Sequence, residues 1–188
     1  MSELPLRAAA LVSIAVLLLT AIAGAAVVVG SPDTGKQLIQ IVKDQVLGKV
    51  EARDPLSLAV FIFFNNLQAC ILLFLGGATF GLLTLFIIAS NGVIIGGIME
   101  IAREERGPLF VAAAILPHGI FEIPALLISS SLGFVLGAAL LAEWWGEGDS
   151  AATARAHART FLLVVVPLVA IAAFIEAFIT PQIIHLVT

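Results

Sequence analysis

Three long stretches without a charged side chain constrain the fold of this chain more than any other feature. No Asp, Glu, Lys or Arg occurs from Ala8 to Pro32, from Pro55 to Met99, or from Ile123 to Ala142. A helix needs about 20 apolar residues to cross the hydrocarbon core of a bilayer, so the middle stretch can hold two crossings. Because 61% of the residues are hydrophobic and only 12% are charged, too few polar side chains remain to cover a soluble domain. The sequence therefore predicts an all-α, polytopic transmembrane helical bundle, a multi-pass protein of the cell membrane.

We expect a single membrane domain over residues 1–188. Its N-terminal segment resembles a secretory signal in having Arg7 before an apolar run, but that run of about 23 residues is longer than a usual signal core. This segment is therefore predicted to be the first transmembrane helix. The predicted helices cover residues 8–30, 34–53, 56–75, 77–99, 108–116, 117–142 and 160–180.

The most polar part of the chain predicts an amphipathic helix over residues 34–53. Thr34 and Gln37 fit a capping box at its start. Apolar residues then recur every four positions from Leu38 to Val50, with basic and acidic side chains between them. We expect this helix to lie in the membrane interface. The alternative is that it packs against the ends of the other helices or against a second subunit.

Prolines interrupt the apolar segment that follows residue 107. A proline inside a helix removes one backbone hydrogen bond and clashes with the carbonyl four residues before it. Residues 108–116 would span only about 14 Å as a helix, roughly half a membrane. Pro117, Gly119 and Pro124 are therefore predicted as helix breaks. We expect residues 108–116 to form a re-entrant half-helix and residues 117–142 a longer helix.

Four polar side chains in the apolar segments form a predicted buried polar cluster. His118 and Glu122 are one helical turn apart and share a face, while Asn65 and Asn91 lie in the middle of predicted membrane helices. An ionisable group at membrane depth needs a partner, and it is a functional-site candidate by default. One hypothesis is a hydrogen-bonded structural pair that satisfies backbone groups freed by the prolines. The other is a relay for protons or ions.

Several kinds of chemistry lack their usual residues. Zinc needs three or four ligands, and the remaining candidates His157, His185 and Glu176 are far from His118 in sequence, so we expect no metal and no cofactor. No HExxH, GxSxG or paired-aspartate motif occurs, which predicts that the protein is not an enzyme. The net charge of −4 and the lack of a basic stripe argue against nucleic acid as a partner.

Pairs of glycines four residues apart recur along the apolar segments. Such spacing makes a groove on one helix face and lets a second helix approach closely. Together with the amphipathic helix, these grooves offer more packing surface than one small bundle needs, so we expect a homodimer. The helix-packing glycines are Gly77 and Gly81, Gly92 and Gly96, and Gly133 and Gly137.

Residues 55–140 resemble the stage II sporulation protein M family of integral membrane proteins. The most specific part of the resemblance is Pro117-His118-Gly119 followed by Glu122, and Asn65, Asn91 and the paired glycines add to it. The resemblance implies a non-enzymatic membrane scaffold, which in sporulating bacteria recruits partners that degrade septal peptidoglycan during engulfment. We expect membrane lipids as partners of such a bundle, and the resemblance adds other membrane or cell-envelope proteins as candidate partners.

We therefore expect a scaffold or partner-recruiting component of a membrane complex. The alternative is a transporter or channel subunit that uses the buried His, Glu and Asn side chains, because broken helices near the midplane are typical of transporters. A water-accessible cavity that reaches His118 would favour the alternative, and a dry, fully packed pair would favour the scaffold.

The positions of Lys and Arg predict a topology. If residues 117–142 return to the face from which residues 108–116 enter, every Lys and Arg except Arg7 lies on one side. If residues 117–142 cross the membrane fully, the split is six against three. The positive-inside rule prefers the first arrangement, with four crossings, one re-entrant hairpin and both termini outside.

Overall fold

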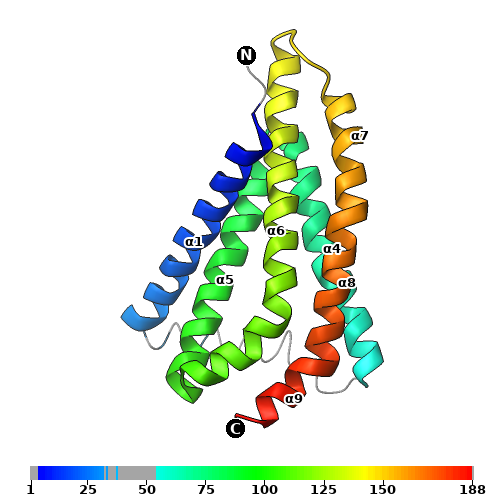
Figure 1. Ribbon diagram of the computed structural model, residues 1–188. Coiled ribbons are helices and arrows are strands. Elements are labelled where there is room, and N and C mark those ends of the chain that lie inside the picture. Colours follow the sequence, from blue (N-terminus) through cyan, green and yellow to red (C-terminus); the bar gives the residue numbers. More distant parts are fainter. Residues whose placement is uncertain (1–3, 32, 34–36, 38–53, 188) are drawn as a thin grey trace.

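The computed structural model describes residues 4–31, 33, 37 and 54–187, and the secondary structure of these residues is helical (Figure 1). Five helical stretches in this part of the chain are long and apolar enough to cross a membrane, which confirms the predicted all-α bundle. The predicted helix over residues 34–53 lies outside the described residues.

The elements are α1 (Leu6–Gly30), α4 (Pro55–Leu75), the 3-10 turn η2 (Gly76–Thr79), α5 (Leu82–Arg106), α6 (Pro108–Trp144), α7 (Ser150–Thr160), the π-helical η3 (Phe161–Val165), α8 (Val166–Phe174), the π-helical η4 (Ile175–Ile179) and α9 (Thr180–His185).

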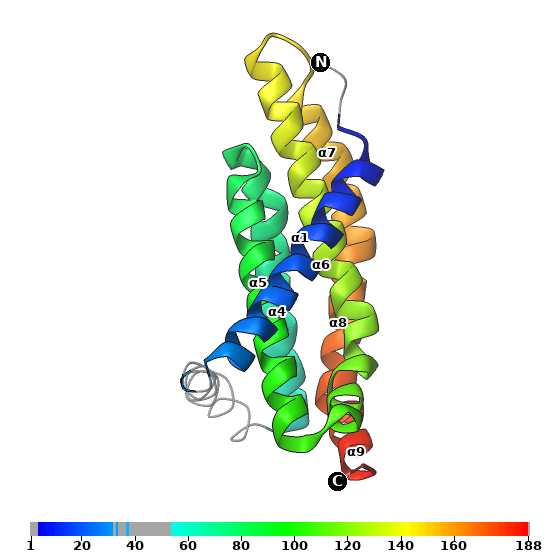
Figure 2. The same cartoon turned by 90° about the vertical axis from the view of Figure 1, so that its left-hand side faces the viewer.

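Helix α6 forms the centre of the bundle and is the most buried of the five membrane-length stretches. Helix α1 packs obliquely across α5 and α6 (Figure 2), and α4 packs against α5, α6 and α8. The elements from α7 to α9 follow one another as a single column beside α6 (Figure 1). The N-terminal end of the described chain and its C-terminal end therefore lie at opposite ends of the bundle.

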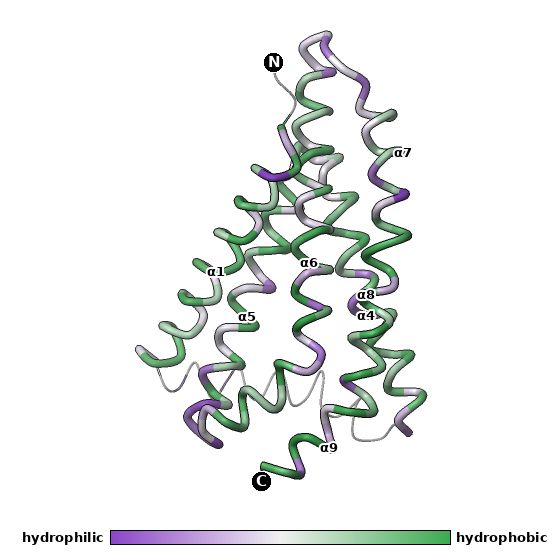
Figure 3. Tube along the Cα trace, in the orientation of Figure 1, coloured by the Kyte–Doolittle hydropathy of each residue, from purple (hydrophilic) through white to green (hydrophobic). Residues whose placement is uncertain are grey.

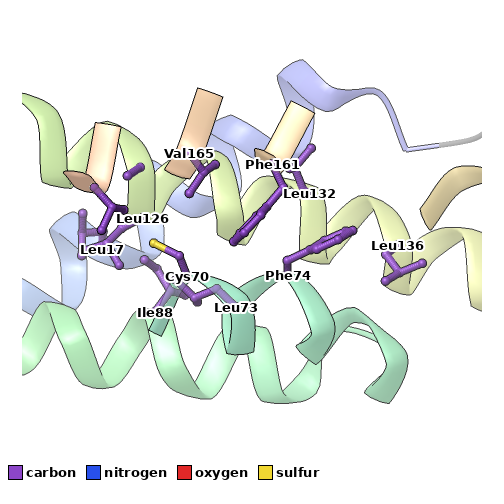
Figure 4. Close-up of a cluster of buried hydrophobic side chains, with 12 residues drawn as sticks. Leu17, Cys70, Leu73, Phe74, Ile88, Leu126, Leu132, Leu136, Phe161 and Val165 are labelled. Atoms are coloured by element: carbon purple, nitrogen blue, oxygen red, sulfur yellow. The ribbon is translucent and has the colours of Figure 1, made fainter. Parts of the chain in front are cut away.

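The apolar core is built where these helices meet (Figure 4). Leu73 of α4, Ile88 of α5 and Leu132 of α6 are fully buried in it. The rings of Phe74 and Phe161 stack with centroids 5.7 Å apart and join α4 to the last column. The core thus ties all five membrane-length stretches together, because Leu17 brings α1 into the same cluster.

The paired glycines pack against other helices of the same chain. A Cβ at Gly92 or Gly96 would collide with Thr20 or Ala21 of α1, so these glycines allow α1 and α5 to cross closely. A Cβ at Gly133 would collide with the backbone of α4. The grooves that motivate the homodimer are therefore occupied within one chain. The homodimer stays a prediction that these glycines no longer support.

The connection between α4 and α5 is short, but it extends further along the sequence than predicted. Gly76–Thr79 form a 3-10 turn, and Phe80 and Gly81 adopt left-handed backbone conformations with φ of 57° and 83°. The lack of a Cβ makes the second of these conformations inexpensive for Gly81. Helix α5 therefore begins at Leu82 and not at residue 77 as expected.

The predicted division of residues 108–142 into two helices is wrong. The structure has one helix, α6, with Pro117 and Pro124 inside it. A proline removes a single backbone hydrogen bond, so it can bend a helix whose flanking turns remain intact. Figure 1 shows α6 running across the bundle at its lower end and then turning to pass along its whole length. The two ends of the described chain lie at opposite ends of the bundle, unlike the predicted arrangement with both termini on one side.

The last membrane-length stretch is longer than the predicted span of residues 160–180. It begins at Ser150, where the Asp149 carboxylate accepts a hydrogen bond of 2.8 Å from the backbone N–H of Ala152. The alanine-rich sequence after residue 150 favours the helix, since Ala has the highest intrinsic helix propensity. Two short π-helical segments interrupt the column, and such segments occur frequently at functional sites.

Candidate functional site

The lower half of α6 faces a cavity of about 300 Å³ between α4, α5, α6 and η4. Most of its lining is apolar, as expected inside a membrane bundle. Figure 3 shows a hydrophilic stretch within this otherwise apolar part of α6. The polar side chains that line the cavity are Asn65, Asn66, His118, Glu122 and Glu176.

His118 and Glu122 are placed together by the helix itself. The distance from His118 Nε2 to Glu122 Oε2 is 3.9 Å, which is longer than a hydrogen bond and short enough for one bridging water. The other ring nitrogen, Nδ1, lies 3.5 Å from the hydroxyl oxygen of Thr180 in α9. The side chains of His118 and Glu122 are 15% and 25% exposed, so both remain open to the cavity.

Glu176 is the member of the site that sequence reasoning did not place. It lies in the π-helical η4 and brings a carboxylate oxygen to His118 and Glu122, so that one ligand-type atom from each residue lies within 4.8 Å of the others. The available signal was its position inside an apolar span. Helical periodicity could not connect it to residues 118 and 122, because they belong to a different helix.

Only one of the two predicted asparagines joins the cluster. Asn65 lines the cavity, and its Nδ2 group lies 3.4 Å from the side-chain oxygen of Asn66, which the sequence analysis did not assign. Asn91 is not among the residues that line the cavity. Its Nδ2 group donates a hydrogen bond of 2.9 Å to the carbonyl of Ile87 on its own helix, which satisfies the amide locally.

The predicted helix breaks surround the cluster without ending the helix. Pro117 and Pro124 lie on either side of His118 and Glu122, and each lacks the N–H that would bond to the carbonyl four residues before it. Gly119 is buried and faces the cavity between them. The prolines thus leave backbone carbonyl groups with reduced hydrogen bonding in the same turns that carry the polar side chains.

The electrostatics of the cluster require a positive partner. Two carboxylates within 4.8 Å of each other repel by about 3 kcal/mol at an effective dielectric constant of about 20. A proton on one carboxyl group, a protonated His118 ring or a bound cation would relieve this repulsion. One imidazole and two carboxylates are also ligand types that first-row metal ions accept. The three side chains can therefore hold a positive charge in any of these forms.

The helical bundle and its polar cavity define the protein as a helical membrane-type protein. The family model described as stage II sporulation protein M matches residues 13–181, and the chain belongs to this family. An uncharacterized protein from Methanocaldococcus jannaschii is 37% identical over 126 residues, which cover 65% of this chain and 70% of the relative. A second uncharacterized protein from the same organism is 35% identical over 88 residues, which cover 47% of this chain and 37% of the relative. No solved structure matches the chain.

Proposed function

We propose that the protein is a multi-pass cell-membrane protein that moves a cation across the membrane through the cluster of His118, Glu122 and Glu176. The observation that carries this proposal is the cavity that joins these three side chains inside the bundle. Ionisable side chains at membrane depth are costly, and they mark ion pathways or proton relays in membrane proteins. The proline-bent helix beside the cavity supports the same function, since irregular helices line the binding sites of many transporters.

The positive-inside rule supports a cytoplasmic position for the end of the bundle near α9. Helix α1 ends and α4 begins toward that end (Figure 1), and the sequence between them contains four of the nine Lys and Arg residues. Arg103 and Arg106 in the last turn of α5 add two more. In this proposed orientation the cluster takes up its cation from the cytoplasmic side.

The experiment measures cation flux in vesicles that contain the purified protein. We expect wild-type vesicles to pass protons or a divalent cation such as Mn²⁺ faster than empty vesicles. Glu122→Gln and Glu176→Gln should each reduce this flux at least tenfold. Glu105→Gln is the matched control, because Glu105 is exposed near the end of α5, outside the cavity. Equal flux in all of these proteins would contradict the proposal.

A second candidate function is the scaffold that recruits partners, which the family resemblance implies. The feature that favours it is the end of α6, where Trp144 and Trp145 are 76% and 70% exposed. Exposed tryptophans are frequent anchors at protein–protein interfaces as well as at membrane surfaces. Crosslinking in native membranes tests this function. One defined partner that is captured by the wild type and lost with Trp144→Ser and Trp145→Ser would support it.

In either function the protein carries out no covalent chemistry under our proposal, because the catalytic motifs sought in the sequence are absent. Under the transport proposal the measured quantity is movement of the cation. Under the scaffold proposal it is the retention of a partner.

A further inference from the structure

We propose that the transported cation is a proton and that the ring of His118 passes it between two cavities that meet at this residue. This inference rests on the proposed transport function and names its substrate. It also assigns a direction of uptake, from the end of the bundle near α9 toward Glu122.

Two further cavities extend from the cluster to the end of the bundle. The second cavity, of about 360 Å³, is lined by both His118 and Glu176 and reaches Thr180 and His185 in the last turns of the chain. The third, of about 400 Å³, shares His185 with the second and reaches Gln182. Gln182 and His185 are exposed. The three cavities therefore lie in series from the exposed end of α9 to the polar cluster.

His118 is the residue at which the first and second cavities meet. Its Nδ1 atom faces the hydroxyl of Thr180 in the second cavity, and its Nε2 atom faces the carboxylate of Glu122 in the first. An imidazole ring can accept a proton at one nitrogen and release another from the opposite nitrogen. The two nitrogens of this ring thus face the two sides between which a proton would move.

The proposed step balances without another reactant. Neutral His118 with its proton on Nε2 accepts a proton at Nδ1 from water in the second cavity and becomes an imidazolium. It then releases the Nε2 proton, through one water across the 3.9 Å gap, to the carboxylate of Glu122, which becomes a neutral acid. The ring is left neutral with its proton on Nδ1. Rotation of the ring then turns its N–H toward Glu122 and its unprotonated nitrogen toward Thr180, so the next proton can be accepted.

The groups around His118 suit a proton better than a directly bound metal ion. Glu122 of α6, Glu176 of η4 and Thr180 of α9 lie next to the ring. The cavities that the ring borders are also lined by Asn65 and Asn66 of α4 and by His185 of α9. Helix α5 contributes only Ile95 and Ile98 to the cavity lining. Zinc ligands lie about 2.0 to 2.2 Å from the ion, so ligand atoms up to 4.8 Å apart would have to move inward. A proton needs only one water between them.

On the side of the cluster away from α9, Leu132 of α6 is fully buried in the apolar core. We therefore propose that release on that side requires the helices to rearrange, as in alternating access. Under this proposal the protein is a proton carrier.

The test measures proton movement into vesicles that contain a pH-sensitive dye, with a potassium gradient and valinomycin setting a negative interior voltage. Wild-type vesicles should acidify at least tenfold faster than vesicles that contain His118→Gln. His157→Gln is the matched control, because His157 is a partly buried histidine in a separate cavity near Ala138. It should acidify at the wild-type rate. Equal rates for wild type and His118→Gln, or equal losses in both variants, would overturn the inference.

Thr180→Val provides a second test that keeps the His118 ring. Valine has nearly the shape of threonine and removes only the hydroxyl that faces Nδ1, so the fold should persist even if His118→Gln does not fold. We expect proton uptake to fall at least threefold, and an unchanged rate would contradict the relay. Parallel vesicles receive Mn²⁺ without a pH gradient. Wild-type uptake of Mn²⁺ without proton movement would overturn the inference and leave the proposed transport function standing, whereas movement of neither ion would overturn both.

Discussion

The two halves of α6 differ in packing although they belong to one helix. From Ser129 to Gly137 almost every residue is buried, and the helix touches the backbone of the α4–α5 turn. From Ala114 to Glu122 most residues are only partly buried, and the helix borders two cavities. The upper half is a closely packed surface, and the lower half borders two cavities that contain polar side chains.

Side-chain size and backbone chemistry explain this difference. The upper half is rich in Ser and Gly, and its buried hydroxyls bond to carbonyls of the same helix, as Ser129 does to Ala125 at 2.7 Å. Such residues let neighbouring helices approach closely at little polar cost. The lower half contains two prolines and larger polar side chains, and it borders a cavity that α4, α5 and η4 also line. The comparison teaches that one continuous helix can combine a closely packed half with a half that borders a polar cavity.

The largest expected effect is on the packed half. Gly133→Leu would place side-chain atoms against the backbone of Leu73 and the side chain of Thr84, where even a Cβ does not fit. We expect a loss of at least about 3 kcal/mol of stability, at the upper end of overpacking costs. Thermal unfolding in detergent, followed by size-exclusion chromatography, measures it. Gly30→Leu is the control, because nothing lies within 4 Å of its added Cβ. Equal melting temperatures would show that the upper half is not tightly packed.

A carboxylate in the lower half of α6 should matter for transport and not for folding. Glu122→Gln keeps the size and polarity of the side chain, and the residue borders a cavity, so we expect a stability change below about 1 kcal/mol. Cation flux in vesicles should fall at least tenfold. Unfolding and flux are measured on the same preparation. A large loss of stability with flux retained per folded molecule would reverse the proposed division between the halves.

Substitutions of the two predicted asparagines should have different effects on cation flux in the same assay. Asn65→Leu removes an amide that lines the cavity, so we expect cation flux to fall severalfold. Asn91→Leu removes an amide that bonds only to Ile87 of its own helix, and flux should remain within twofold of the wild type. The ratio of the two rates is the measured quantity. A ratio near one would mean that the cavity boundary does not define the transport site.

The smallest expected effect concerns Asp54, which lies outside both halves. Its carboxylate accepts hydrogen bonds of 3.1 Å from the backbone N–H groups of Leu56 and Ser57 at the start of α4. The hydrogen bond from the Ser57 hydroxyl, together with these backbone bonds, lowers the pKa of Asp54 from its ordinary value of 3.8. Because the pKa is lower in the folded state, this contribution to stability is present above 3.8 and is lost as the pH falls through the folded-state pKa.

Thermal unfolding of wild type and Asp54→Ala at several pH values measures this effect. The wild type should melt slightly higher at pH 6, and the difference should shrink below pH values of about 4. Asp149→Ala, at the start of α7, is a comparison for a cap at the opposite end of the bundle. A difference between wild type and Asp54→Ala that does not depend on pH would show that the carboxylate charge contributes nothing to the cap.

Features that depend on neighbouring residues follow from the sequence alone. The uncharged stretches predict the membrane helices, because the hydrocarbon core requires a fixed length of apolar chain. Asp54-Pro55 and Gly107-Pro108 mark the starts of α4 and α6, since proline at the first helical position costs no hydrogen bond. His118 and Glu122 are adjacent because helical geometry places residues four apart on one face.

Only the tertiary structure decides which helices meet and which residues face each other across them. It brings Glu176 to His118, leaves Asn91 bonded to its own helix, and fills the glycine grooves with helices of the same chain. It also lets α6 continue through its two prolines, and the two ends of the described chain lie at opposite ends of the bundle. The physical reason is range: hydrogen bonds and side-chain spacing act within one helix, whereas the rotation and position of each helix depend on close packing against all the others.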